Sequence, residues 1–142
     1  MSDFNYQLTL ADIGKKLVDL ENDAAFIVLL TADYAADEFV DHYLEDIPGG
    51  AIVATASISG LSFDGAIWDG TDITFSPGPD AGSAVTQAVL YVSDGASPET
   101  NRLVRKISAD TYGGFPFTTN GLDIILSWPN DADKIWAFVN IT

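Results

Sequence analysis

Two stretches decide the fold, AFIVLLT at residues 25–31 and AVTQAVLYVS at residues 84–93. The first is continuously apolar over the length of a strand, which predicts burial of both its faces. The second predicts a long strand near the centre of a sheet. Other short runs are rich in β-branched and aromatic residues and are separated by Gly, Asp and Pro: IVATASIS (52–59), LSFDGAIWDG (61–70), TDITFSP (71–77), RLVRKIS (102–108), LDIILSW (122–128) and KIWAFVNIT (134–142).

Helices are expected only in the N-terminal third. Residues 9–21 place Leu10, Ile13, Leu17 and Leu20 on one helical face, with Thr9 as a possible cap. A second, acidic helix is predicted over 33–47, where Tyr34, Phe39, His42, Tyr43 and Ile47 lie near helical spacing before the break at Pro48-Gly49-Gly50.

About seven or eight strands that do not alternate with helices favour a mainly β protein. We expect an antiparallel β-sandwich or jelly-roll-like domain with one or two short N-terminal helices. The chain of 142 residues is long enough to bury a core. It is divided into an N-terminal helix or arm at 1–22 and a β-sandwich domain at 23–142.

The charge of the chain is strongly acidic and unevenly distributed. The net charge is −15, and residues 17–101 hold 15 acids without a single Lys or Arg. Phosphate contacts and anionic lipid surfaces both need cations, so we expect no nucleic-acid or membrane partner. A solvated, solubilising surface and attraction to a basic partner are both consistent with this charge. The chain contains no cysteine, which excludes disulfides and thiolate chemistry.

His42 is the only histidine and lies among Asp41, Glu45 and Asp46 in the sequence. A histidine oriented by a carboxylate is typical of a general base. However, no serine nucleophile motif accompanies it, so we interpret it as a partly exposed histidine on the acidic helix. The glycine pairs 49–50 and 113–114 lack the frame of a phosphate loop. We therefore expect no catalytic residue and no cofactor site.

Acidic turns and tryptophans leave two further interpretations open. Aspartates in turns can bind calcium, although they are also ordinary turn formers, and none here matches an EF-hand loop. We therefore expect no metal site. Tryptophans can form a platform for sugar or protein, although core packing is the simpler interpretation. The aspartates are Asp64, Asp69, Asp72, Asp131 and Asp133, and the tryptophans are Trp68, Trp128 and Trp136, of which Trp128 is the candidate for exposure.

Six stretches follow one another in a recognisable order: FIVLLTADY (26–34), DHYLEDI (41–47), GGAIVATASISGL (49–61), AIWDGTDITF (66–75), AVTQAVLYVSDGASPETNRLVRKIS (84–108) and GGFPFTTNGLDIILSW (113–128). This order of segments over residues 25–128 resembles a family of small virion structural proteins of tailed phages. A shorter segment between Leu61 and Ile73 departs from the family pattern, and residues 1–22 are similar only in being predicted helical.

This resemblance implies a non-enzymatic capsid decoration (cement) protein that binds and stabilises the shell of major capsid protein. It further implies a homo-oligomer on the capsid surface of the virion, made in the host cytoplasm. A tail or neck component is the alternative within the particle. A carbohydrate- or receptor-binding β-sandwich module and, less favoured, a hydrolase are the alternatives outside it. Irregularity of the chain suggests contact segments at 1–22, 76–83 and 94–101.

Overall fold

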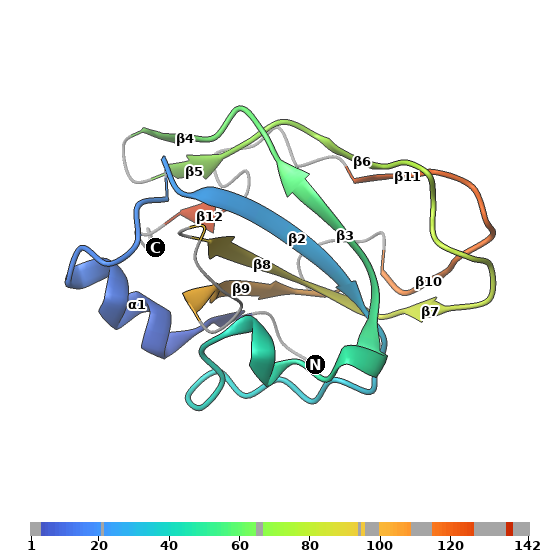
Figure 1. Ribbon diagram of the computed structural model, residues 1–142, viewed down its shortest axis with the longest axis horizontal. Helices are drawn as coiled ribbons and strands as arrows, with labels where there is room; N and C mark the ends of the chain where they lie inside the picture. The colour runs from blue at the N-terminus through green and yellow to red at the C-terminus, as the bar shows by residue number, and fades with distance from the viewer. Residues whose placement is uncertain are drawn as a thin grey trace.

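The computed structural model confirms a mainly β protein, built on a five-stranded antiparallel sheet in the order β1-β9-β8-β2-β3 (Figure 1). It describes residues 4–20, 22–64, 67–93, 95, 100–108, 115–126 and 136–137. The strands of this sheet are β1 (Phe4–Asn5), β2 (Ala24–Leu30), β3 (Ile52–Ile58), β8 (Gln87–Ser93) and β9 (Arg102–Ile107). The predicted run at 25–31 forms β2, and most of the run at 84–93 forms the neighbouring strand β8, with Val28 opposite Val89. The first two residues of the latter run instead form the separate short strand β7 (Ala84–Val85).

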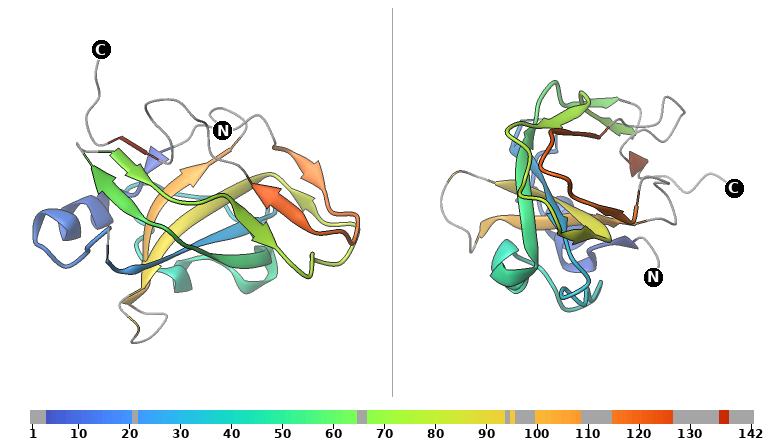
Figure 2. Two further views of the ribbon diagram at one scale, coloured as in Figure 1. Left: turned by 90° about the horizontal axis from the view of Figure 1, so that it is seen from above. Right: turned by 90° about the vertical axis from the view of Figure 1, so that its right-hand side faces the viewer.

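A second layer of short strands lies over one face of this sheet, as Figure 2 shows. It consists of three small antiparallel ladders, in which β12 and β4 flank β5, β11 pairs with β6, and β10 pairs with β7. Their bounds are β4 (Ser62–Asp64), β5 (Ile67–Asp69), β6 (Ile73–Phe75), β7 (Ala84–Val85), β10 (Phe117–Thr118), β11 (Ile124–Leu126) and β12 (Trp136–Ala137).

The central sheet is buried on both faces, as the apolar run at 25–31 predicts. Successive side chains of a strand point to opposite faces, so β2 contributes to two cores. Ile27 and Leu29 pack with the second layer, around the buried Trp68. Val28 and Leu30 pack on the other side, where the segment between β2 and β3 covers the sheet. Each face of β2 therefore has its own apolar cluster.

The helix α1 (Gln7–Gly14) is shorter than the predicted range 9–21. Leu10 and Ile13 pack against the core as expected. The predicted cap was wrong, because Thr9 is buried inside the helix and Tyr6 occupies the N-cap position. Beyond Gly14 the chain leaves the helix, and Lys16 adopts a left-handed conformation with φ 63°. That change of direction leaves Leu17 exposed rather than on a buried helical face.

The predicted acidic helix over 33–47 was wrong. This segment contains turns and one short 3-10 helix, η1 (Leu44–Asp46), and a second, η2 (Gly49–Ala51), precedes β3. Tyr34 and Ile47 are buried as a helical face would require, but Phe39 is exposed. No helix of the described residues is long and apolar enough to cross a membrane.

Candidate functional site

Residues 37–41, here called the 37–41 turn, form a tight turn between β2 and η1. The amides of Val40 and Asp41 donate to the carbonyl oxygen of Asp37 at 3.4 and 3.0 Å. The carboxylate of Asp37 accepts from the amide of Phe39 at 2.9 Å, and that of Asp41 accepts from the amide of Asp37 at 3.0 Å. Aspartates often fix turns in this way, because their short side chains reach nearby amides.

A buried chain of hydroxyls holds this turn from inside the molecule. The Tyr34 hydroxyl donates to the Asp41 carboxylate at 2.7 Å, and the Tyr6 and Tyr34 hydroxyl oxygens are 2.8 Å apart. Burial raises the pKa of both tyrosines, so their hydroxyls stay protonated and able to donate. The amide of Gln7 also donates to the Glu38 carbonyl oxygen at 2.9 Å. The turn is thereby joined to the start of α1.

The 37–41 turn presents two apolar side chains to solvent. Phe39 is 66% exposed and Val40 is 67% exposed. Single exposed apolar residues are common on protein surfaces. Two adjacent ones on a turn whose backbone is fixed by side-chain hydrogen bonds are preorganised for contact, because little conformational entropy remains to be lost on binding.

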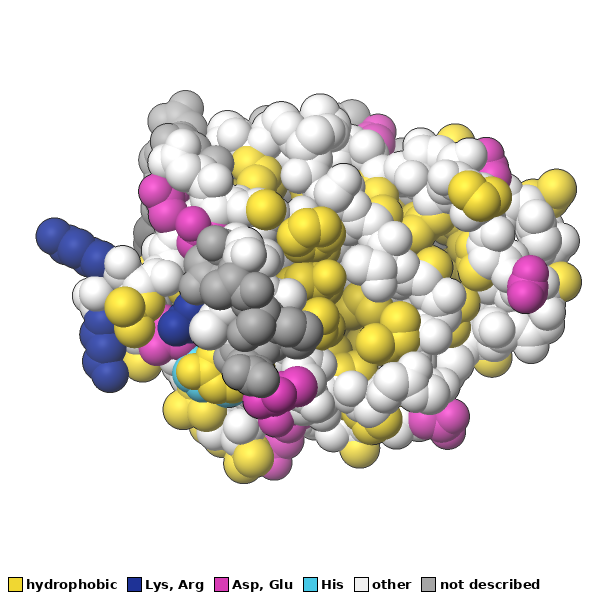
Figure 3. All heavy atoms as spheres, in the orientation of Figure 1, with side chains coloured by type: hydrophobic (Ala, Val, Ile, Leu, Met, Phe, Trp, Pro, Cys, Tyr) yellow, Lys and Arg dark blue, Asp and Glu magenta, His cyan; other side chains and the backbone are white. Residues whose placement is uncertain are grey.

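Basic side chains gather at the end of the molecule that carries α1 and β9. Among the described residues, Lys15 and Lys16 are the exposed bases and follow α1 directly. Arg102, Arg105 and Lys106 lie on β9, where Lys106 is buried with its ammonium 5.1 Å from the centre of the Phe4 ring. Figure 3 shows Lys or Arg side chains at this end of that face, with acidic side chains both beside them and farther along the face.

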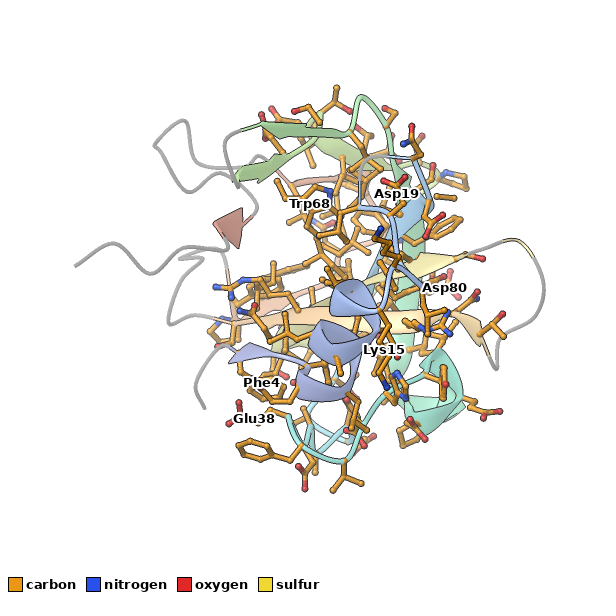
Figure 4. All side chains as sticks on the ribbon, turned by 90° about the vertical axis from the view of Figure 1, so that its left-hand side faces the viewer. Phe4, Lys15, Asp19, Glu38, Trp68 and Asp80 are labelled. Carbon is orange, nitrogen blue, oxygen red and sulfur yellow. The ribbon has the colours of Figure 1, made fainter. Side chains whose placement is uncertain are left out.

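Acidic side chains surround the 37–41 turn in the sequence, and Glu38 lies within it. Figure 4 shows Glu38 close to Phe4, at the opposite end of that view from Trp68 and Asp19. The segment around the turn contains no Lys or Arg, and its acids are Asp33, Asp37, Glu38, Asp41, Glu45 and Asp46. The turn therefore combines an apolar tip with acidic neighbours in the sequence.

His42 does not lie on a helix, and the carboxylate that its ring contacts is not one of its sequence neighbours, although its backbone amide donates to Asp46 at 2.9 Å. Its Nε2 contacts Oδ2 of Asp12 from α1, and the same oxygen accepts from Nε of Arg102 on β9 at 2.8 Å. The His42 ring also lies against Tyr43, with 4.0 Å between ring centres. In the part of the chain that the structure describes, no hydroxyl group forms a hydrogen bond with this imidazole. The cluster joins α1, the segment before η1 and β9.

The predicted contact loop 76–83 is largely exposed and is held by hydrogen bonds to the segment before β11. Gly78 donates to the Asp123 carboxylate at 3.1 Å, and Thr119 exchanges backbone bonds with Gly82 and Ser83. Leu122 and Ile125 nearby are 67% and 66% exposed. An open hollow of about 460 Å³ separates the loop from the start of β3. This end of the molecule is a second exposed apolar surface.

The other predicted contact segments have different positions. Residues 4–20 pack into the fold, since β1 pairs with β9 and Tyr6 is fully buried. Most of loop 94–101 lies outside the described residues.

The aspartates and tryptophans considered as metal or sugar ligands do not form a common site within the described residues. No group of three or more His, Asp or Glu side chains in this part of the chain is arranged to hold a metal ion. Trp68 is buried and donates to the Leu20 carbonyl oxygen at 2.8 Å, so it is a core residue. The backbone of Trp136 pairs with that of Trp68 in β12 and β5. Trp128, Asp131, Asp133 and the side chain of Asp64 lie outside the described residues.

The sequence pattern did not single out the 37–41 turn or the exposure of Phe39 and Val40. Helical spacing placed Phe39 with buried residues, whereas the spacing of Asp37 and Asp41 was the available sign of a turn.

Comparisons of the chain with protein-family models, with curated proteins and with solved structures give no match.

Proposed function

We propose that this protein is a non-enzymatic capsid decoration protein that binds and stabilises the shell of major capsid protein in a tailed-phage virion. The ordered resemblance over residues 25–128 supports this assignment to the particle. The observation that carries a binding role is the 37–41 turn, in which a fixed backbone presents Phe39 and Val40 to solvent. Preorganised apolar groups are typical of protein contacts.

The polar clusters favour binding over catalysis. Asp12 is shared by His42 and Arg102, and Asp41 is shared by Tyr34 and the amide of Asp37. In both clusters the carboxylate joins separate segments of the chain, which is a structural role. High-copy binding to a shell also suits a strongly acidic chain, because its net charge of −15 opposes aggregation.

The test is cosedimentation of the purified protein with shells assembled from the major capsid protein encoded in the same genome. We expect saturable binding at a fixed ratio to the capsid subunits, and cryo-EM of the decorated shells should show the protein on their outer surface. Absence of binding to shells, together with binding to isolated tails, would favour the alternative of a tail or neck component.

A carbohydrate- or receptor-binding module is the second candidate, and it rests on the tryptophans. Trp68 is a core residue, so a sugar platform would depend on Trp128 and Trp136, of which Trp128 is the one expected to be exposed. A glycan array separates the two hypotheses. Specific glycan binding that the substitution Trp128→Ala abolishes would overturn the decoration proposal, whereas a decoration protein should bind no glycan on the array.

A further inference from the structure

We infer that the 37–41 turn is the docking element of this protein, and that it inserts Phe39 and Val40 into an apolar pocket rimmed by Lys or Arg side chains on the major capsid protein. The identity of that partner rests on the proposed function. The turn itself is inferred from its contacts, its exposure and the charges around it.

The backbone of the turn is fixed, whereas its two apolar side chains are exposed to solvent. Its backbone is fixed by the Asp37 and Asp41 carboxylates, and Asp41 is in turn bound by the buried Tyr34 hydroxyl. A solvent-exposed turn does not need such an internal network in order to place Phe39 and Val40 in water. The network has a clear use if these two side chains must be presented in one orientation, because aromatic anchors in a partner's pocket dominate many interfaces.

The acidic residues of the turn indicate which kind of partner it binds. Glu38 lies between Asp37 and Phe39, and its carboxylate has no hydrogen-bond or ion-pair partner among the described residues. Glu38 directly beside an apolar tip, in a segment without Lys or Arg, is complementary to a pocket with a basic rim, and such charges mainly accelerate association. A second copy of this chain is a poor partner, because it also carries a net charge of −15. An anionic membrane or a nucleic acid is disfavoured for the same reason.

The chain offers a matched control for the apolar tip. Leu122 and Ile125 are as exposed as Phe39 and Val40, but they lie near loop 76–83. We therefore compare the double variant Phe39→Ser/Val40→Ser with Leu122→Ser/Ile125→Ser, in cosedimentation with the capsid shells described above. We expect the first to bind at least about tenfold more weakly than the native chain and the second to bind as the native chain does. Circular dichroism and thermal unfolding should be unchanged in both, because all four side chains are exposed.

A charge variant tests the rim separately from the tip. Glu38→Gln should slow association with the shells at low salt and weaken the dependence of its rate on salt, because one steering charge is lost. Asp80→Asn is the control, since Asp80 is an exposed acid in loop 76–83. We expect its association rate to match that of the native chain.

The outcomes of these experiments distinguish a failure of the docking inference from a failure of the proposed function. If the native chain binds shells and Phe39→Ser/Val40→Ser binds equally well, the docking inference is overturned and the decoration proposal stands. Loss of binding in Leu122→Ser/Ile125→Ser alone would also overturn the inference, in favour of the loop 76–83 surface. If the native chain does not bind shells at all, both the decoration proposal and the named partner fall.

Discussion

Asp12 holds three parts of the molecule together with one carboxylate. Its Oδ2 is bound by His42 from one side and by Arg102 from the other, and the residue is almost fully buried. Neither contact could be predicted from the sequence, because His42 is 30 residues away from Asp12 and Arg102 is 90 residues away. The sequence instead suggested Asp41, Glu45 and Asp46, of which Asp46 accepts a hydrogen bond from the backbone amide of His42 rather than from its ring.

Replacing Asp12 should therefore destabilise the fold. Asp12→Asn keeps the shape of the side chain but removes the charge that His42 and Arg102 share. We expect the free energy of unfolding at pH 7 to fall by about 1–3 kcal/mol, because a partly buried guanidinium loses its counter-charge. Urea denaturation measures this change. Glu45→Gln is the control, since Glu45 is exposed on η1, and a control effect as large as that of Asp12→Asn would contradict the prediction.

Gly78 is constrained by a close approach of two backbone segments. A Cβ atom at this position would lie 1.9 Å from the Leu122 carbonyl oxygen. Gly78→Ala should therefore push loop 76–83 away from residues 122–123 and break the bond to Asp123, with a loss of about 1–3 kcal/mol in unfolding free energy. Gly50→Ala is the matched control, because a Cβ there meets nothing within 4 Å. Equal thermal unfolding temperatures for the two variants would show that the contact is unimportant.

At the scale of elements, the strands were the most predictable part of the fold. The runs at 25–31 and 84–93 became β2 and β8 because a continuous apolar stretch needs cover on both faces, and the two cores supply it. The helix at 9–21 was predicted too long. Its spacing was correct for Leu10 and Ile13, but the chain turns away after Gly14, and Leu20 reaches the core from the segment that follows.

The segment 33–47 shows why apolar spacing alone can mislead. Tyr34 and Ile47 are both buried, as a helical face predicts, yet the residues between them form a turn. The physical cause is the pair Asp37 and Asp41, whose carboxylates bind backbone amides that a helix would use for its own hydrogen bonds. Such competition is a local property, but the turn is also held by the Tyr34 hydroxyl, which in turn contacts the hydroxyl of the distant Tyr6. The candidate docking site was therefore missed.

The tyrosine chain behind the 37–41 turn gives the fold a dependence on alkaline pH. Burial is the largest cause that raises the pKa of Tyr6 and Tyr34 above 10.0, the ordinary value for tyrosine. Below pH 10 both hydroxyls are protonated in the folded and unfolded chains alike. Above it, the unfolded chain releases these protons while the folded chain retains them, so the free energy of unfolding should fall as pH rises.

Urea denaturation between pH 8 and pH 11 measures this fall. The variant Tyr34→Phe should be less stable than the native chain at pH 8, because it loses two hydrogen bonds, by about 1–3 kcal/mol. Its stability should then fall less steeply above pH 10, because one titrating group has been removed. A slope equal to that of the native chain would mean that Tyr34 does not control the transition.

At the scale of the whole molecule, the charge is distributed unevenly both along the sequence and in the fold. The sequence places 15 acids in residues 17–101 without a base. In the structure the described bases all lie on β9 or directly after α1, and three of them make contacts within the fold. Acids therefore outnumber bases over most of the described chain, and the 37–41 turn contains acids but no base.

Such a charge should make the fold more stable in salt. At a net charge of −15 the acids repel one another more strongly in the folded chain than in the unfolded chain, because folding brings them closer together. Salt screens this repulsion, with a Debye length of about 30 Å at 0.01 M and about 3 Å at 1 M. It also weakens the Asp12 contacts with His42 and Arg102, but these are partly buried and thus screened less. We therefore expect the thermal unfolding temperature to rise with sodium chloride between these concentrations. Calorimetry measures it, and a lower unfolding temperature in high salt would mean that the ion pairs outweigh the net repulsion.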